Sequence, residues 1–591
     1  MLKQTTFVFF LVLTIVQNTW GAKIPRPNFK IQNSEIGFLV IAPDRGFVGN
    51  NETLSIFKSF RKEYLAKIIF IGRKYDGLSS NYSEYIQKAL TSFDELSVNK
   101  IVILPLFLSK YNHILQELKI NFPLYKRKAQ IHWNETMSES YMTGQILLDR
   151  VNKISKNPGE ENLVILGRGA IDKKSEKLMN KELERLSDYI KQRAVFKSIQ
   201  TGIYYSYSAK DKIRDLKNSE VDEMVIHAAA KRGDTLVIPF FIGPKYSNMM
   251  SLTHFFDRRF QDIDIIHNPD EILLHPNVLL WMKKTANKYI PLSNHESIGV
   301  VIMPHGATKP YNDAIEKTIE PLKSKYKIEM AYGMGDAIAI QNAVSKLEHQ
   351  GIKKIVFVRM YPTSNQLKEK TDYILGLSNK IPKQWDGLIS PQIRSSSIIN
   401  TFGGYEEDNL IAGIFLDRIK EVSKNPAQET VIILAHGSDD DKAEVLRKNK
   451  IQNHIEWIQK QFKPPFKKIT NMALREDWPE KREKALNEIR NIIKEGNETG
   501  KVIIISNRLY GSGPYKHFLK GLNFDMNSKG LAPHPNLTSW LKKGIDLVIK
   551  NKFLSQNKTD ISQLPSIPPR FPLVAPPLPL IPPPKVTLLS D

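Results

Sequence analysis

Short, continuous apolar runs recur along the chain, and four of them end in a loop where one residue precedes a glycine. These runs are Ile36–Pro43, Leu163–Gly167, Ile298–Pro304 and Val431–Ala435. The residue before the loop glycine stands at positions 45, 168, 305 and 436, so the pattern repeats in steps of 123, 137 and 131 residues. A long amphipathic pattern, typical of helices, follows each run. Buried strands that alternate with helices indicate a parallel sheet covered on both faces.

A second buried strand is expected later in each repeat. These strands are predicted at Lys100–Ser109, Thr235–Gly243, Lys354–Thr363 and Lys501–Gly511. Each repeat then holds the elements of a three-layer α/β/α domain with a parallel sheet, at an ordinary domain size of about 130 residues. We expect four such domains, over residues 35–155, 160–290, 296–425 and 428–552.

A longer period pairs these domains. Only the second and fourth repeats close with a His-Pro-Asn turn, at His275 and at His534, 259 residues apart. The loop glycines Gly46 and Gly306 lie 260 residues apart. The sequence thus predicts two tandem modules of two domains each. We expect both histidines to belong to a structural turn before the last helix, with Pro setting φ and Asn capping, rather than to bind a metal.

The two ends of the chain differ from the repeats. Residues 1–22 combine Lys3, the apolar core Phe7–Val16 and the small residues Gly21 and Ala22, as a secretory signal peptide does. Ten apolar residues are too few to span a bilayer comfortably, and no later segment has the apolar length of a transmembrane helix. We therefore expect an exported protein with no transmembrane helix in the mature chain. Residues 560–591 are rich in proline, which predicts an extended, disordered tail.

Composition narrows the possible chemistry. The 591 residues include no cysteine, which excludes disulfides, thiolate metal sites and a cysteine nucleophile. Any metal must therefore be held by His, Asp, Glu or backbone oxygen. The net charge of +23 favours anionic partners. Basic clusters such as Lys126–Lys128 are not interleaved with aromatic residues, and export argues against nucleic acid, so we expect no nucleic-acid partner.

Ligands of open parallel sheets bind beyond the carboxyl ends of the strands. In the fourth repeat His436 follows one such strand, and His517 follows the next through a loop with Gly511 and Gly513. Two imidazoles can bind a divalent metal and leave its other positions open, as insertion or catalysis requires. Glu476, after a strand-like run, is a candidate third ligand or proton acceptor. The alternative is that these histidines only pack or cap in their loops.

The strand–His-Gly loop, the acidic loop and the strand–Gly/Ser loop–His resemble the class II chelatases. These are the sirohydrochlorin cobaltochelatase family, CbiX-like, and its ferrochelatase relatives. The segments Val300–Leu375 and Ile101–Leu118 are similar to the family as well. The resemblance extends over about residues 35–550. It implies chelatase-like, doubly wound domains that insert a divalent metal into a tetrapyrrole without a nucleotide.

Transferred to this chain, the two histidines of the family fall on His436 and His517, with Glu476 at the acidic position. The resemblance implies that the two imidazoles hold the metal and accept pyrrole protons, with Glu476 as an assisting base. Basic side chains near them are expected to meet the carboxylates of the macrocycle; these are Arg475, Arg508 and Lys516.

The other three repeats depart from the family pattern. The third keeps His305 alone, and the first has Arg45 at the first histidine position and His113 at the second. The second has Arg168 and, in place of the second histidine, Lys245–Ser247. Arginine cannot ligate a metal but grips carboxylates in a bidentate manner. The first module is therefore expected either to bind a polycarboxylate tetrapyrrole through Arg45 and Arg168 or to be a degenerate structural partner.

Two functions remain open at this point. The first is an exported chelatase whose second module inserts Co, Ni or Fe, as substrate, into an anionic tetrapyrrole. The second is a non-catalytic periplasmic or secreted protein that binds metal or tetrapyrrole on a degenerate chelatase fold. Packing of the two modules and homo-oligomerisation are both compatible with the sequence.

Overall fold

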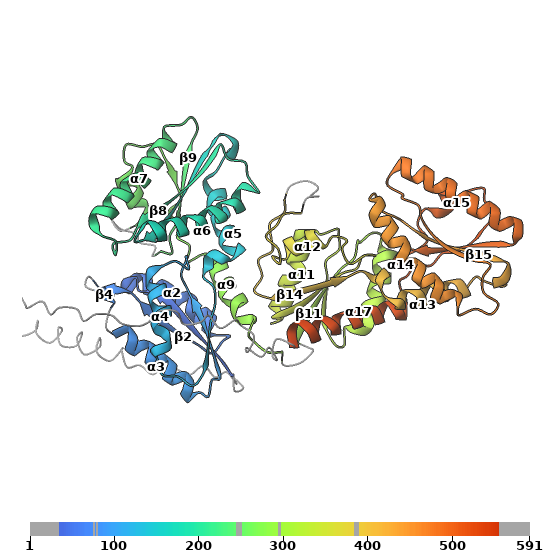
Figure 1. Cartoon of the computed structure of the whole chain (residues 1–591), viewed down its shortest axis with the longest axis horizontal. Coiled ribbons are helices and arrows are strands. Elements are labelled where there is room, and N and C mark those ends of the chain that lie inside the picture. Colours follow the sequence, from blue (N-terminus) through green and yellow to red (C-terminus); the bar gives the residue numbers. More distant parts are fainter. Residues whose placement is uncertain are drawn as a thin grey trace, which may run out of the picture.

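The computed structural model describes residues 35–74, 77–78, 81–243, 251–292, 297–382 and 389–554. They form four α/β units, seen in Figure 1 as a blue and green pair and a yellow and orange pair. The predicted signal peptide, the proline-rich tail and Lys245–Ser247 lie outside the described residues. Within the described part, none of the helices combines the length and the apolar character needed to span a membrane.

The elements follow the same alternation in every unit. Unit 1 comprises β1 (Ile36–Pro43), α2 (Gly46–Arg61), β2 (Ala66–Ile71), the short β3 (Arg73–Lys74) and β4 (Gly77–Leu78), α3 (Asn81–Glu95), β5 (Lys100–Pro105), α4 (His113–Asn121), β6 (Gln130–Trp133) and α5 (Tyr141–Ile154). Unit 2 comprises β7 (Asn162–Ala170), α6 (Lys173–Lys191), β8 (Ser198–Tyr205), α7 (Asp211–Ala229), β9 (Thr235–Phe240), α8 (Leu252–Arg259), β10 (Ile266–His267) and α9 (Pro276–Asn287). Unit 3 comprises β11 (Ile298–Met303), α10 (Lys309–Ile319), β12 (Lys327–Met330), α11 (Ala337–His349), β13 (Lys354–Arg359), α12 (Lys368–Ile374), β14 (Ile398–Gly403) and α13 (Asn409–Lys420). Unit 4 comprises β15 (Glu429–Ala435), α14 (Asp441–Gln459), β16 (Lys468–Ala473), α15 (Pro479–Thr499), β17 (Lys501–Asn507), α16 (Tyr515–Phe518), β18 (Asp525–Asn527) and α17 (Pro535–Val548).

Each unit has one parallel, four-stranded sheet, and all four sheets share one strand order. The orders are β2-β1-β5-β6, β8-β7-β9-β10, β12-β11-β13-β14 and β16-β15-β17-β18. The first strand of each unit lies between its second and third strands, so the loops after the first and third strands are neighbours at one edge of the sheet. The predicted architecture of four α/β units in two tandem modules is confirmed.

The last helix of each unit packs on the other unit of its module. In the first module α5 lies against β9 and α6 of unit 2, whereas α9 lies against α2 and β5 of unit 1. In the second module α13 lies against α14 and β17, and α17 returns to α10 and β14. Figure 1 shows this return, with the red α17 beside the yellow sheet of unit 3. The helix exchange was not predicted from the sequence.

Because of this exchange, the two units of a module share one hydrophobic core. One core joins Phe38 of unit 1 to Leu163 of unit 2, and the other joins Val300 of unit 3 to Ile503 of unit 4. The opposite face of each sheet has a separate core of its own. Each module is therefore a two-unit body, consistent with strand runs that are apolar on both faces.

The His-Pro-Asn turns are structural, as predicted, but the capping residue differs. His275 is the N-cap of α9, where its Nδ1 accepts the backbone N–H of Asn277 at 3.1 Å. The side chain of Asn277 does not cap; it is buried and donates to the carbonyl of Met142 at 3.1 Å. His534 caps α17 in the same way, with a distance of 3.1 Å to the backbone nitrogen of Asn536. A proline at the first helical position fixes the approach of the histidine ring to the helix.

The capping histidines also connect the two units of each module. His275 Nε2 lies 2.9 Å from Asp149 Oδ2 on α5, and His534 Nε2 lies 3.2 Å from Asp417 Oδ2 on α13. Asp149 carries a further contact, because Arg394 Nη2 of unit 3 reaches its two oxygens at 2.7 and 2.6 Å. The hydroxyl of Tyr141 also donates to the carbonyl of Ile393 at 2.9 Å. The first module is thus docked on unit 3 through α5.

Candidate metal site

The candidate site lies where the first and third strands of unit 4 end. His436 directly follows β15, and the glycine after it adopts a left-handed φ of 91°. The equivalent glycines Gly46 and Gly306 have φ of 72° and 76°, so three of the four predicted loops share this turn. The fourth differs from the prediction: β7 continues through Arg168 to Ala170 with a bulge, and Arg168 lies on the strand rather than in a loop.

Both ring nitrogens of His436 have neighbours. Nδ1 lies 2.9 Å from the carbonyl oxygen of Gly437, and because a carbonyl only accepts, Nδ1 must carry the proton. Nε2 lies 3.1 Å from Asp477 Oδ2, so this nitrogen and a carboxylate oxygen face each other. This spacing fits a direct hydrogen bond, and it also fits two ligand atoms of one metal ion. The side chains are 37% and 69% exposed, which leaves the pair open to solvent.

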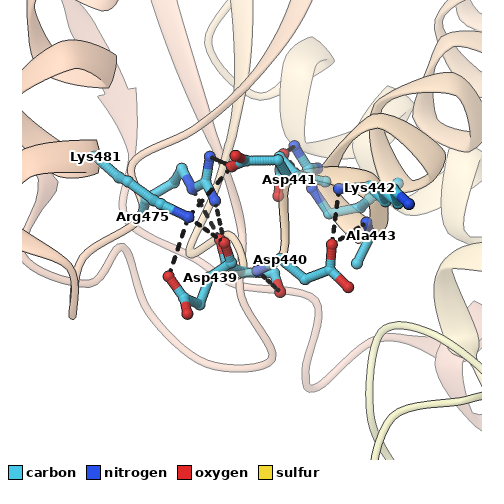
Figure 2. A network of polar contacts seen from close by, with 10 residues as sticks. Asp439, Asp440, Asp441, Lys442, Ala443, Arg475 and Lys481 are labelled. Carbon is cyan, nitrogen blue, oxygen red and sulfur yellow. Dashed lines mark hydrogen bonds and ion pairs between the residues drawn. The ribbon is translucent and has the colours of Figure 1, made fainter.

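The His436 loop is held by Arg475, which was predicted to meet the substrate (Figure 2). Its backbone nitrogen donates to the carbonyl of His436 at 2.6 Å. Its guanidinium donates to the carbonyls of Ser438 at 2.8 Å and Asp439 at 2.6 Å and pairs with Asp441 at 2.5 Å. Arg475 has a φ of 58°, a left-handed conformation that is uncommon for a side-chain-bearing residue. In this structure its donors are directed at the loop.

Lys481 reinforces the same loop. Its Nζ donates to the carbonyl of Asp439 at 2.5 Å and lies 3.1 Å from the carboxylate of that residue and 3.4 Å from Asp441. Figure 2 shows Arg475 and Lys481 approaching the loop together. Asp439 and Asp441 of the His436 loop are therefore each next to a positive charge. These charges are Arg475, in the turn before α15, and Lys481, in its first turn.

Glu476, the predicted third ligand or base, is held in an ion pair. Arg508, directly after β17, donates through Nη1 to both its oxygens at 2.6 and 2.8 Å. Burial by itself lowers the pKa of Arg508, but the neighbouring Tyr515 and Glu476 raise it above its ordinary value. The side chain of Glu476 is only 10% exposed. The acidic side chain that faces His436 is instead Asp477, which sequence reasoning missed although it adjoins Glu476.

His517 and Lys516 lie on the short helix α16 and are exposed. The ring of His517 contacts the edge of Phe518, with centroids 5.5 Å apart. Among the described residues, no group of three or more His, Cys, Asp or Glu side chains lies close enough together to hold a metal ion. His436, His517 and Glu476 therefore do not form a closed metal site in this conformation, and their assignment as ligands stays a prediction.

The His305 loop of unit 3 faces the same region from the other unit. His305 is exposed, and its Nδ1 lies 2.6 Å from the carbonyl of Gly306, which repeats the arrangement of His436. Gly306 rests on the ring of Tyr332, where Gly437 rests on Arg475. Tyr311, at the start of α10, contacts Tyr510 of unit 4 with ring centroids 6.3 Å apart. The loops of the two units thus meet near Arg508.

In the first module the predicted anion-binding arginines differ from each other. Arg45 is largely buried, and its Nη2 donates to the carbonyl of Gly49 at 2.7 Å and to Thr53 Oγ1 at 2.9 Å. Arg168 is exposed and stacks on Tyr207, 4.8 Å from the ring centroid. His113 is half-buried at the first residue of α4. In unit 1, therefore, the arginine at the first histidine position hydrogen-bonds to residues of the helix that follows it, α2.

Comparison with known proteins leaves the family open. The sequence matches no protein-family profile and no curated protein. SirB from Bacillus subtilis, solved with Fe3+, is similar over 42% of this chain and 95% of its own, at 13% identity and a TM-score of 0.32. DR2241 from Deinococcus radiodurans, described as a multi-domain protein with structural similarity to chelatases, is similar over 42% of this chain at 12% identity and a TM-score of 0.30. The likeness spans about half, 54%, of the length of DR2241. At these TM-scores neither likeness bears on what this chain binds.

Proposed function

We propose that the protein is an exported, sirohydrochlorin cobaltochelatase-like enzyme whose second module inserts a divalent metal into an anionic tetrapyrrole. The proposal rests on one observation above all. Nε2 of His436 and the carboxylate of Asp477 face each other at 3.1 Å, in a solvent-open position beyond the carboxyl end of a central strand. Ligand atoms bound about 2.1 Å from one ion fit this spacing.

In this mechanism the metal ion, Co, Ni or Fe, is a substrate. The Gly437 carbonyl fixes the tautomer of His436 and so keeps Nε2 available as a ligand. His517, on the short helix α16 that follows β17, is the proposed second imidazole. Once the metal passes to the macrocycle, the freed Nε2 and the freed carboxylate can accept the two protons that leave the pyrrole nitrogens. Arg508, which pairs with Glu476, and the exposed Lys516 on α16 are the proposed partners for carboxylates of the macrocycle.

The resemblance of the sequence to class II chelatases supports this activity, and residues 1–22 support export. His305 is proposed as a supporting metal ligand from unit 3, and His113 as the candidate metal ligand of unit 1. Arg168 is the proposed carboxylate-binding residue of the first module.

A second function is favoured by a specific observation. Glu476 is bound to Arg508, and the described residues hold no group of three ligands. A site with two or three open ligands and an engaged base is suited to binding metal or tetrapyrrole without insertion. In that case the protein captures metal or pigment outside the cytosol on a chelatase fold.

One experiment separates the two functions. The full mature chain is mixed with Co2+ and sirohydrochlorin, and the absorption spectrum is followed against the uncatalysed rate. Insertion faster than the uncatalysed rate supports the chelatase. Tight pigment or metal binding with no acceleration supports the binding protein. A protein that shows no binding and no acceleration would contradict both functions.

A matched pair of variants tests the acidic ligand. Asp477→Asn is expected to weaken Co2+ binding about tenfold or more, because the carboxylate facing His436 is lost. Glu476→Gln is the control at the adjacent position, and it is expected to leave Co2+ binding nearly unchanged. The opposite ranking in a calorimetric titration would return the acidic role to Glu476.

A further inference from the structure

A carboxylate of unit 3 is buried inside unit 4. Glu406 lies in the 3-10 turn Tyr405–Glu407 that joins β14 to α13, and only 1% of it is exposed. Its carbonyl lies 2.7 Å from His454 Nε2 on α14. Its Oε1 accepts a hydrogen bond from Asn507 Nδ2 at 2.6 Å. Both the backbone and the side chain of Glu406 therefore end on residues of the other unit.

Asn507 is directly connected to the candidate metal site. It is the last residue of β17 and pairs in the sheet with Ala435, the residue before His436. The residue after it is Arg508, which holds Glu476. The hydrogen bond from Asn507 to Glu406 thus lies one residue beneath both strand tips that carry the site.

Arg447 completes this cluster from α14. It is 6% exposed, and it donates to Glu444 Oε1 through Nε at 2.9 Å and Nη2 at 2.6 Å. The buried Glu406 Oε2 and Arg447 Nη1 have no hydrogen-bond partner among the described residues. Burial raises the pKa of Glu406, and the positive charge of Arg447 opposes that rise. Such a cluster is expensive to bury, so it needs a reason beyond packing.

The first module has different residues at the same three places. Glu406 and Arg447 correspond, 268 residues earlier, to Ser138 in the turn Met137–Glu139 and to Met179 on α6. Asn507 corresponds by sheet register to Phe240, which pairs with the residue before Arg168. Met179 and Phe240 belong to the apolar core shared by units 1 and 2. Ser138 takes part in a different buried polar contact, because its hydroxyl donates to Glu182 Oε1 of unit 2 at 3.1 Å. What differs is the strand tip itself: Asn507, which hydrogen-bonds to a carboxylate of the other unit, accompanies histidine, whereas the apolar Phe240 accompanies arginine.

We infer that Glu406 is a positioning residue for the site of unit 4: through Asn507 it fixes the tip of β17 and the paired tip of β15, so that the metal site is formed only when unit 3 is docked. The inference goes one step beyond the proposed function and rests on it only where it concerns metal. Its mechanical part, the fixing of the two strand tips by a residue of another unit, holds whatever the site binds.

The test replaces the whole cluster by the residues of the first module. The triple variant Glu406→Ser, Arg447→Met, Asn507→Phe removes the three side chains of the cluster but leaves Glu444 without its Arg447 donors. Some loss of stability is therefore expected, and the melting temperature is measured to show that the variant is folded at the temperature of the assays. Hydrogen exchange at residues 436–441 and 508–513 is expected to accelerate about tenfold, because the strand tips lose their anchor. Binding of Co2+ is expected to weaken by about tenfold or more, with an altered d–d absorption spectrum.

Two further variants keep the test decisive. Glu406→Gln retains an acceptor for Asn507 and is expected to keep wild-type exchange and wild-type Co2+ spectra. Asn507→Ser removes only the hydrogen bond and is expected to accelerate exchange at the same residues, should the triple variant fail to fold. Ser138→Ala, at the matching place in the first module, is the control that leaves both readouts unchanged.

The outcomes separate this inference from the proposed function. Unchanged exchange at both strand tips in the triple variant and in Asn507→Ser would overturn the inference, because exchange is measured without metal. Accelerated exchange in a protein whose wild type binds no Co2+ would support the positioning role and contradict the metal site instead. Acceleration spread over the whole of unit 4 would also overturn it, since the cluster would then be only a packing element.

Discussion

The two modules share the contacts that join their units but differ at the strand tips. In both modules a glutamate at the start of the second unit accepts a hydrogen bond from a serine at the end of the first. Ser155 Oγ donates to Glu161 at 2.5 Å, and Ser423 Oγ donates to Glu429 at 2.5 Å. An arginine of the exchanged helix also reaches the same loop in both, since Arg150 donates to Glu271 O at 2.9 Å and Arg418 to Gly530 O at 3.0 Å. The joints between units are therefore duplicated in detail.

At the strand tips the same scaffold carries different chemistry. The first module has arginine there, one buried against its own helix and one stacked on a tyrosine. The second has a histidine in each unit, and in unit 4 a carboxylate faces it. Residues common to both modules are thus explained by the joint between units, whereas residues that differ mark the place where a function is to be sought. His275 and His534 belong to the first class despite being histidines.

The largest expected effect concerns the difference between the modules. His436→Ala combined with His517→Ala is expected to abolish measurable Co2+ binding, because both imidazoles of the proposed site are lost. Isothermal titration on the full chain measures it. His254→Ala, an exposed histidine on α8 of the first module, is the control and should change nothing. An unchanged binding stoichiometry in the double variant would move the site to another part of the chain.

An intermediate effect concerns the capping histidines, which both modules have at the contact between their two units. His275→Ala and His534→Ala each remove a helix N-cap and are expected to lower the free energy of unfolding by about 1 kcal/mol. Urea unfolding measures both, and His→Asn at either position should recover most of the loss because Asn also caps. Loss of Co2+ binding in His534→Ala at unchanged stability would contradict the structural role of the turn.

The smallest effect is a dependence of stability on pH to which the buried Glu406 of the second module should contribute. Because burial raises the pKa of Glu406, the folded state binds this proton more tightly than the unfolded state does. Its contribution to stability is full below the unfolded pKa of about 4.5 and is lost as pH rises through the folded value. Glu406→Gln should flatten the dependence in urea titrations above pH 4.5. An identical slope in the variant would assign the dependence to other groups.

Periodicity was enough to predict the fold but not the joints within it. Apolar runs such as Ile36–Pro43 and Val431–Ala435 mark central parallel strands, and their repeat gives the number of units. The exchange of α9 and α17 is invisible to such a pattern, because an amphipathic helix does not record which sheet its apolar face meets. The cap on α9 was misassigned for a similar reason: both His275 and Asn277 carry acceptors, and only the backbone shows which one faces the free N–H groups.

For the candidate site, the sequence located the loops but not the contacts of their side chains. His436 lies where its spacing predicted, beyond a central strand. Glu476 and Asp477 are chemically alike and adjacent, and their roles are separated by Arg508, which approaches from another strand. Arg475 is basic and near the site, yet its guanidinium donates to the carbonyls of Ser438 and Asp439 in the His436 loop. Partner choice among neighbouring polar groups depends on three-dimensional direction, which residue spacing does not encode.

The exchange of the last helices sets the smallest piece of this protein that can stand alone. A chain cut between α13 and β15 would leave unit 3 without the helix that covers β14, and unit 4 without the one that covers β17. A lone unit would expose that apolar sheet face unless two copies traded helices with each other, as a symmetric dimer. A cut within a module therefore separates two units that share a helix exchange and a hydrophobic core, and the smallest self-covering piece of this chain is the pair.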